Sequence, residues 1–195
     1  MRRRQAGFSL IELVTVVGVL AIVMLAVGQI VERVQRQYES QRKQVEAADN
    51  ARAALDTLVR LLRMAGNNPR GLAGVQGIVP DLDGNGAFDT IALQSDWNPV
   101  DGALTGAYEN IVFFAAGGSL MKREEGDPVE GVEFAPGIEA VTFAYFDTSM
   151  NPIANPAAAA ERIAYVSVSL LMQPPGPNPP PPVTISSGAA VRRRE

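Results

Sequence analysis

The chain has 195 residues, a formal net charge of −4 at pH 7, and neither cysteine nor histidine. Disulfides and imidazole catalysis are therefore excluded, and zinc, haem and thiol chemistry lack their usual ligands. The charge is uneven, because Arg2, Arg3 and Arg4 make the N-terminus basic, whereas residues 67–191 hold four basic and fourteen acidic residues. Since an acidic body repels phosphate backbones, we expect no nucleic-acid binding by this domain.

The first predicted element is a membrane span. Residues 13–31, LVTVVGVLAIVMLAVGQIV, form an apolar run of nineteen residues without a charge. A helix needs about 20 such residues to cross a bilayer. The arginines before it predict a cytoplasmic N-terminus, with the chain after Val31 outside the cytoplasm.

Residues 32–64 are highly charged and contain no glycine or proline. Their apolar residues recur at steps of three and four, which indicates one apolar helix face. Gly66 follows Arg60 and Arg63, the usual signature of a helix C-terminus. We therefore predict one helix from Phe8 to Ala65, with residues 8–31 in the membrane and the amphipathic part, 32–65, packed on a domain.

That domain, residues 66–191, is rich in short β-like runs. The candidate strands are Thr90–Gln94, Asn110–Ala115, Ser119–Arg123, Ile138–Asp147 and Ile163–Met172, with Val183–Ser187 as an edge strand. Residues 115–119 predict a hairpin turn, residues 174–182 an exposed proline-rich loop, and residues 192–195 a basic tail. The predicted fold class is α+β, a long N-terminal helix packed on an antiparallel β-sheet domain.

The most informative stretch is RRRQAGFSLIELVTVV, residues 2–17. It places a basic leader before Gly7 and Phe8, and a glutamate, Glu12, inside the apolar run. A carboxylate near the centre of a span costs about 2.5–3.5 kcal/mol, and less near an end, so it is usually there to pair with something. A cut between Gly7 and Phe8 would free an amine four residues from Glu12, and a neighbouring subunit's amine would also reach it.

This stretch resembles the class III signal of type IV prepilins and type II secretion pseudopilins. The resemblance implies that residues 1–7 are a leader removed by a prepilin peptidase, which methylates the new N-terminus at Phe8, and that Glu12 pairs with that amine during assembly. It further implies a pilin-like fold, no catalytic residues and no required cofactor. The implied partners are other major and minor pilins or pseudopilins, an inner-membrane assembly platform and the inner membrane. The implied location is a single-pass inner-membrane protein with a periplasmic domain, and later a pilus or pseudopilus.

Three later segments, Gly137–Asp147, Arg162–Leu171 and Ser186–Arg194, are similar to minor pilins of the PilW type and to J-type pseudopilins. We therefore expect a non-enzymatic minor subunit that helps initiate or cap a type IV pilus or a secretion pseudopilus. The identity of the neighbouring genes would distinguish the two machines.

Two other interpretations of the N-terminus stay open. Ala26-Val27-Gly28 before Gln29 resembles the cleavage site of a secretory signal peptide, but a charge at Glu12 and the long run disfavour it. A plain single-span anchor gives no reason for the spacing of Gly7, Phe8 and Glu12.

A second candidate site is the segment DLDGNGAFD, residues 81–89. Asp81, Asp83, Asn85 and Asp89 occupy ligand positions of a calcium loop, although Ala92 stands where the bidentate glutamate belongs. The same residue types also suit an ordinary polar turn. The alternative function is thus a membrane-anchored binding module outside the cytoplasm, whose acidic domain binds calcium or a surface ligand.

The remaining polar motifs give weaker hypotheses. Lys122 next to a hydroxyl would be needed for a serine–lysine dyad, since no histidine exists to activate a nucleophile. Glu124, Glu125 and Asp127 predict a solvated turn, and Trp97 predicts a packing residue in a loop.

Overall fold

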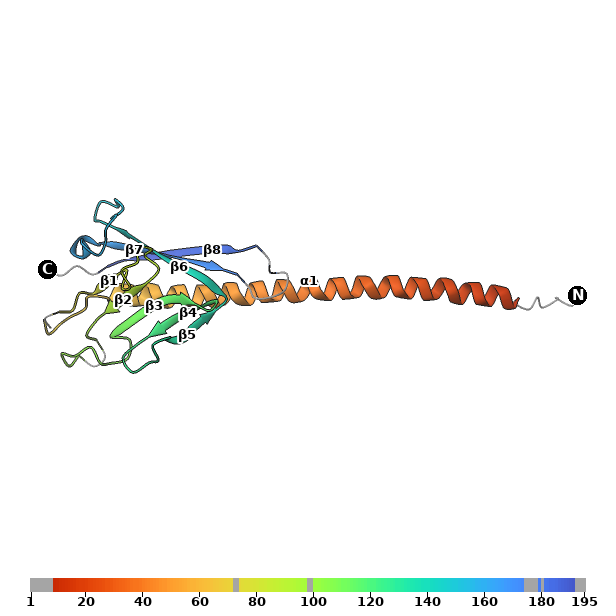
Figure 1. Cartoon of the computed structure of the whole chain (residues 1–195), viewed down its shortest axis with the longest axis horizontal. Coiled ribbons are helices and arrows are strands. Elements are labelled where there is room, and N and C mark those ends of the chain that lie inside the picture. Colours follow the sequence, from red (N-terminus) through yellow and green to blue (C-terminus); the bar gives the residue numbers. More distant parts are fainter. Residues whose placement is uncertain (1–8, 72–73, 98–99, 174–178, 180, 192–195) are drawn as a thin grey trace, which may run out of the picture. The chain divides into compact units, whose positions relative to one another are not determined.

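The computed structural model describes residues 9–71, 74–97, 100–173, 179 and 181–191. A long helix, α1 (Leu10–Met64), comes first, and the strands follow it (Figure 1). The strands are β1 (Ile78–Pro80), β2 (Ile91–Gln94), β3 (Asn110–Ala116), β4 (Ser119–Arg123), β5 (Val132–Pro136), β6 (Ile138–Phe146), β7 (Tyr165–Met172) and β8 (Val183–Ala190). A short 3₁₀ helix, η1 (Ala160–Arg162), precedes β7. The chain divides into two compact units, residues 1–42 and 43–195, and α1 contributes to both.

Helix α1 runs unbroken from Leu10 to Met64 and confirms the prediction of one long N-terminal helix. The last regular hydrogen bond runs from the Ala65 amide to the Leu61 carbonyl, at 2.9 Å. Gly66 then adopts a φ of 80°, and its amide donates to the carbonyl of Gln94 at 2.8 Å. Because glycine adopts positive φ at little cost, it ends the helix and turns the chain toward the sheet.

Strands β1 to β5 form one antiparallel sheet in sequence order. The hairpin between β3 and β4 closes with Gly117 and Gly118, whose φ angles are 61° and 77°. Two positive φ angles in a two-residue loop match the right-handed twist of the flanking strands. The turn predicted at residues 115–119 is therefore confirmed.

Strands β6, β7 and β8 form a second antiparallel sheet. Along β7, Val166, Val168 and Leu170 are buried and alternate with half-buried residues, as the period-two pattern predicts. Gly137, with a φ of 79°, separates β5 from β6, and β6 packs against β3 and β4. The antiparallel domain that the sequence predicts is thus two sheets.

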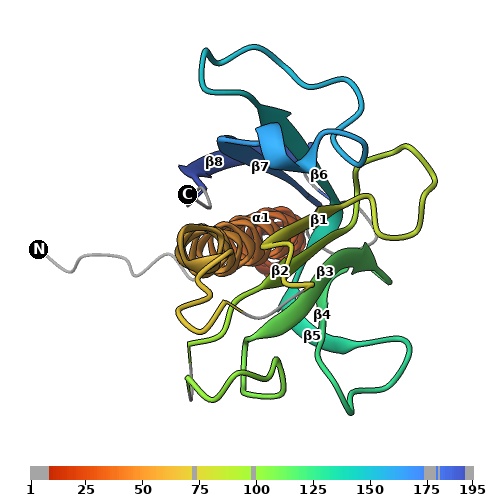
Figure 2. The ribbon, with the colours of Figure 1, turned by 90° about the vertical axis from the view of Figure 1, so that its left-hand side faces the viewer.

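A single core joins the helix and both sheets in the unit of residues 43–195. Figure 2 shows β6–β8 on one side of this part of α1 and β1–β5 on another. From the helix, Ala51, Leu55, Leu58 and Leu62 enter the core at steps of four, three and four. The fold therefore buries one face of the second half of α1 between two sheets.

Strands β1 and β5 were not predicted, and both lie at edges of the first sheet. Each ends in a proline, Pro80 or Pro136, which lacks the amide that a central strand needs. Most of the proline-rich loop at 174–182 and the basic tail at 192–195 lie outside the described residues.

Candidate functional site

The predicted N-terminal site lies at the start of α1 and just before it. Gly7 and Phe8 lie outside the described residues, and Glu12 lies in the first turn of α1. The Ser9 carbonyl accepts the amides of Glu12 and Leu13, at 3.0 and 3.1 Å, and so starts the helix. An acidic side chain in a first turn lies at the positive end of the helix dipole, so Glu12 suits its position.

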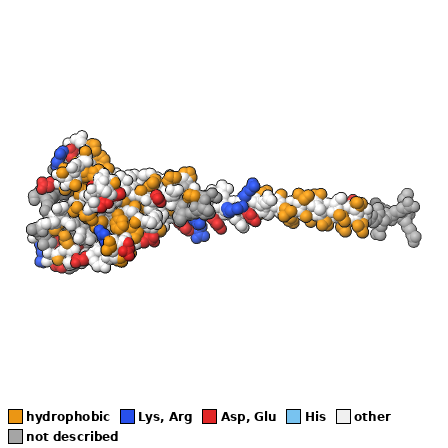
Figure 3. Space-filling model, in the orientation of Figure 1, with side chains coloured by type: hydrophobic (Ala, Val, Ile, Leu, Met, Phe, Trp, Pro, Cys, Tyr) orange, Lys and Arg blue, Asp and Glu red, His pale blue; other side chains and the backbone are white. Residues whose placement is uncertain are grey.

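The apolar side chains after Glu12 are exposed within this unit of the chain. Leu20 is 54% exposed and Ile22 is 69% exposed, and the rest of the run is similar (Figure 3). By length and composition, α1 contains a segment able to cross a membrane, and none of that segment is buried within the protein. An apolar surface of this length requires lipid or other helices to cover it.

The predicted calcium loop lies between β1 and β2 and is ordered by its own side chains. The Asp81 carboxylate accepts the Gly86 amide at 3.0 Å, and its other oxygen is buried without a hydrogen-bond partner. The Asn85 side-chain nitrogen donates to Asp83 at 2.7 Å and to Asp89 at 3.4 Å. The amide of Asn85 thus stands between two of the predicted ligands.

The loop is not arranged as a complete metal site. Across the described residues, no group of three or more acidic side chains is placed to hold a metal ion. Ala92, at the twelfth position of the motif, is a buried residue of β2. The structure therefore links Asp83 and Asp89 through Asn85 but does not gather all the predicted ligands around one point.

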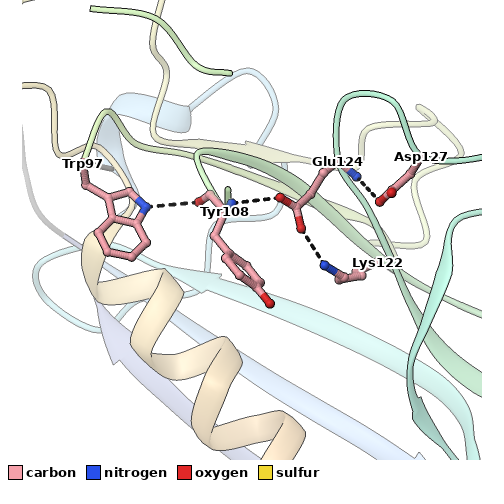
Figure 4. A network of polar contacts seen from close by, with 5 residues as sticks. All are labelled: Trp97, Tyr108, Lys122, Glu124 and Asp127. Carbon is pink, nitrogen blue, oxygen red and sulfur yellow. Dashed lines mark hydrogen bonds and ion pairs between the residues drawn. The ribbon is translucent and has the colours of Figure 1, made fainter. Parts of the chain in front are cut away.

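A polar network joins the ends of β3 and β4, and Figure 4 shows its members. The carboxylate of Glu124 accepts the Lys122 ammonium at 2.6 Å and the Tyr108 amide at 2.9 Å. The Lys122 ammonium also lies 4.7 Å from the centre of the Tyr108 ring. The hydrogen bond to Glu124 raises the pKa of Lys122, against the opposing effect of burial.

The rest of this network fixes the surrounding loops. The Glu124 amide donates to Asp127 at 2.9 Å, and the Trp97 indole donates to the Tyr108 carbonyl at 3.4 Å. The side chain of Glu124 is 18% exposed, so the predicted solvated turn is wrong at this residue, which is held by Lys122. Because the Lys122 ammonium is engaged by Glu124, it is held as a structural ion pair.

The sequence did not predict that two carboxylates, those of Asp96 and Glu109, are buried. Asp96 and Glu109 are both fully buried, at 0% exposure. Glu109 accepts the amides of Trp97 and Gly106, at 2.9 and 2.7 Å. Both residues lie in polar, loop-like sequence, where an acidic residue is normally exposed, so nothing in the sequence signalled their burial.

Comparisons with known proteins address the N-terminal site. The family model of the prokaryotic N-terminal methylation motif matches residues 2–28, which include Gly7, Phe8, Glu12 and the first part of the apolar run. A comparison with curated proteins found no match. Together with a long apolar helix and an antiparallel β domain, this match supports a resemblance of the chain to type IV prepilins and pseudopilins.

Proposed function

We propose that this protein is a non-enzymatic minor pilin or pseudopilin that helps initiate or cap a fibre. A prepilin peptidase cuts between Gly7 and Phe8 and methylates Phe8. Before assembly, the chain is anchored in the inner membrane with its β domain outside the cytoplasm. The observation that carries the proposal is the coincidence of the methylation motif with an apolar helix segment that is exposed along its length. The minor-subunit role rests further on the resemblance of residues 137–147, 162–171 and 186–194 to such subunits.

In this proposal, the exposed half of α1 has two successive environments. In the membrane, lipid covers the side chains of residues 13–31, and in the fibre the helices of neighbouring subunits cover them. Both environments are apolar, so transfer between them costs little in hydrophobic free energy. The transfer then needs a specific contact to direct it.

Glu12 provides that contact. No hydrogen bond or ion pair joins its carboxylate to the described chain, and it lies four residues after Phe8. An unpaired carboxylate near the end of a span gains nothing for an isolated anchor. A charge-assisted hydrogen bond to the Phe8 amine of a neighbour would supply both the missing partner and the register between subunits.

The test compares three variants in cells that assemble the fibre. Glu12→Ala should insert and lose its leader normally but be depleted from sheared fibres. Glu12→Gln should be partly defective, because a neutral hydrogen bond is weaker than a charge-assisted one.

The matched control is Glu32→Ala, which removes an exposed glutamate of the same helix that forms an ion pair with Arg36 at 3.6 Å. Since such surface pairs contribute little, this variant should assemble as the wild type does. Wild-type incorporation of Glu12→Ala would contradict the assembly role and favour the membrane-anchored binding module.

The contacts of Asn85 favour a second candidate function, weak calcium binding by the loop 81–89. Its amide nitrogen, between Asp83 and Asp89, stands where a cation would also be attracted. A rotation of this amide would turn an oxygen toward a cation in the same place. Calcium should then raise the Tm of the full chain, and Asp83→Asn should reduce that rise. An unchanged rise in Asp83→Asn would indicate that the loop 81–89 is an ordinary polar turn that does not bind calcium.

A further inference from the structure

One side of strand β8 pairs with no other strand of the described chain. The order of its sheet is β6-β7-β8, so β8 lies at an edge and has only β7 as a neighbour (Figure 2). Its pairing with β7 is unbroken, from Val183 opposite Met172 to Ala190 opposite Tyr165. The main-chain amides and carbonyls of β8 that point away from β7 are therefore available to a further strand.

The other outer strands carry features that hinder such pairing. β1 has three residues and ends at Pro80, and β5 ends at Pro136 and carries the charged Glu133. β6 has an irregular register between Ile138 and Ala140, and it packs against β3 and β4. Short strands, prolines, charges and bulges are the usual means by which proteins prevent association through sheet edges. β8 has none of these features, because it is eight residues long, uncharged, regular and without proline.

The core is incompletely covered along β8. The inner-face residues of this strand, each opposite a buried residue of β7, are Val183, Ile185, Ser187 and Ala189. Val183 is nevertheless 46% exposed, whereas Met172 opposite it is 4% exposed. A further strand beside β8 would cover Val183 and the half-buried Ile185, and would so extend the core.

The surroundings of this edge define the chemistry of its partner. Neither β7 nor β8 contains a charged residue, although the domain as a whole is acidic. On the outer face, the hydroxyls of Ser169 and Ser186 form a hydrogen bond of 2.8 Å across the two strands. An uncharged strand with hydroxyls on one face and apolar side chains on the other would continue both faces of the sheet. β8 itself is such a strand.

We propose that β8 pairs antiparallel with β8 of a second copy of this chain. Opposite residues of an antiparallel pair share a face, so a register centred on Ser186 keeps both inner faces on one side. In this register Ser186 lies opposite Ser186 of the copy, and Val183 lies opposite Ala189. The contact is symmetric, and it joins two three-stranded sheets into one continuous sheet. It uses neither Glu12 nor the loop 81–89.

Single cysteines test the pairing and its register, because the chain has no cysteine of its own. The two Ser186 Cα atoms should lie about 4.5–5.5 Å apart, within reach of a disulfide. The two Thr184 residues should be offset by about 14 Å along the strands, which is too far. With copper–phenanthroline, the full-length Ser186→Cys chain in detergent should form a disulfide-linked dimer, whereas Thr184→Cys should stay monomeric. Thr184 is the matched control, since it is exposed on the same face of the same strand.

Light scattering in detergent tests the contact without a cross-link. The wild type should have the mass of a dimer, and Ser186→Lys should halve it, because two like charges would face each other. Ser186→Ala also removes the bond to Ser169 but adds no charge, so it should remain a dimer.

Three results would overturn the proposal. The first is a monomeric wild type, which would leave the edge to a different partner or to none. The second is a dimer that Ser186→Lys retains, which would indicate association through α1. The third is equal linking of Ser186→Cys and Thr184→Cys, which would indicate random collision. The cysteine comparison remains decisive if Ser186→Lys does not fold, and no outcome depends on cleavage before Phe8 or on assembly through Glu12.

Discussion

The two halves of α1 are both helical and both carry many apolar residues, but their surroundings are opposite. Leu20, in the first half, is 54% exposed, whereas Leu58, in the second half, is fully buried. In the second half one face enters the core of the β domain and the opposite face carries charges, such as Arg52 and Asp49. In residues 13–31 every face is apolar and none is buried within the chain.

The difference shows that apolar composition alone does not determine whether a helix packs against its own domain or needs another apolar environment. A helix with one apolar stripe packs against its own domain, whereas a helix that is apolar all round needs an apolar environment on every side. The second half of α1 therefore contributes to the stability of the folded chain. The first half contributes to membrane insertion and, in our proposal, to contacts with other subunits.

The largest expected effect is on the stability of the β domain. Leu58→Ala should lower the free energy of unfolding by about 3 kcal/mol, because it leaves a cavity between the helix and the sheets. The matched Leu20→Ala variant should change it by less than about 0.5 kcal/mol. Urea unfolding of the full chain in detergent, followed by Trp97 fluorescence, measures both, and equal effects would remove the distinction between the halves.

A charge introduced into the first half of α1 should reduce membrane insertion and leave the stability of the β domain unchanged. Ile22→Lys should disfavour insertion by roughly 3 kcal/mol, since Ile22 lies near the middle of the apolar run. The fraction of protein in the membrane should fall, while the unfolding midpoint of the β domain stays unchanged, and Ile22→Leu should match the wild type in both. A loss of domain stability in Ile22→Lys would show that the first half is part of the core.

A smaller effect is expected from the ion pair in the β domain. Lys122→Met should lower the free energy of unfolding by about 1–2 kcal/mol, because it leaves the half-buried Glu124 without its cation. Lys43→Met, on the exposed surface of α1, should have almost no effect. Both values come from thermal unfolding at pH 7.

The same pair predicts a pH dependence. The pKa of Lys122 is raised in the folded chain, so the stabilisation is complete below its ordinary value of 10.5 and is lost as the pH rises through the folded-state pKa. The difference between the wild type and Lys122→Met should therefore shrink in strongly alkaline solution. A constant difference up to that range would indicate that packing over the Tyr108 ring, rather than charge, accounts for the effect.

The sequence predicted the elements whose signal is local and periodic. The helix, the alternation along β7 and the turn at Gly117 and Gly118 each depend on neighbouring residues, and each was found. The short edge strands β1 and β5 were missed, because three or five residues ending in proline carry almost no periodic signal. The separation into two sheets at Gly137 was also missed, since any glycine in a loop-rich region suggests a turn equally well.

The candidate sites also differ in whether their sequence signal is local or depends on tertiary contacts. The motif of Gly7, Phe8 and Glu12 is contiguous in sequence, so it was recognised without a structure. The surroundings of Asp96 and Glu109 include contacts with Asn67 and Trp97, which lie 29 and 12 residues away along the chain and which only the tertiary structure brings close. The loop 81–89 lies between these cases, because its ligand spacing is local but the convergence of its side chains is not.

Our proposal requires that cleavage after Gly7 leaves Phe8 as a free, methylated N-terminus for assembly. Mass spectrometry of the N-terminal peptide, from cells that contain a prepilin peptidase, tests it most directly. We expect a mature chain that starts at N-methyl-Phe8, and a Gly7→Val chain that keeps its leader and stays in the membrane. A mature start at Gln29, or an intact leader on the wild-type chain, would contradict it.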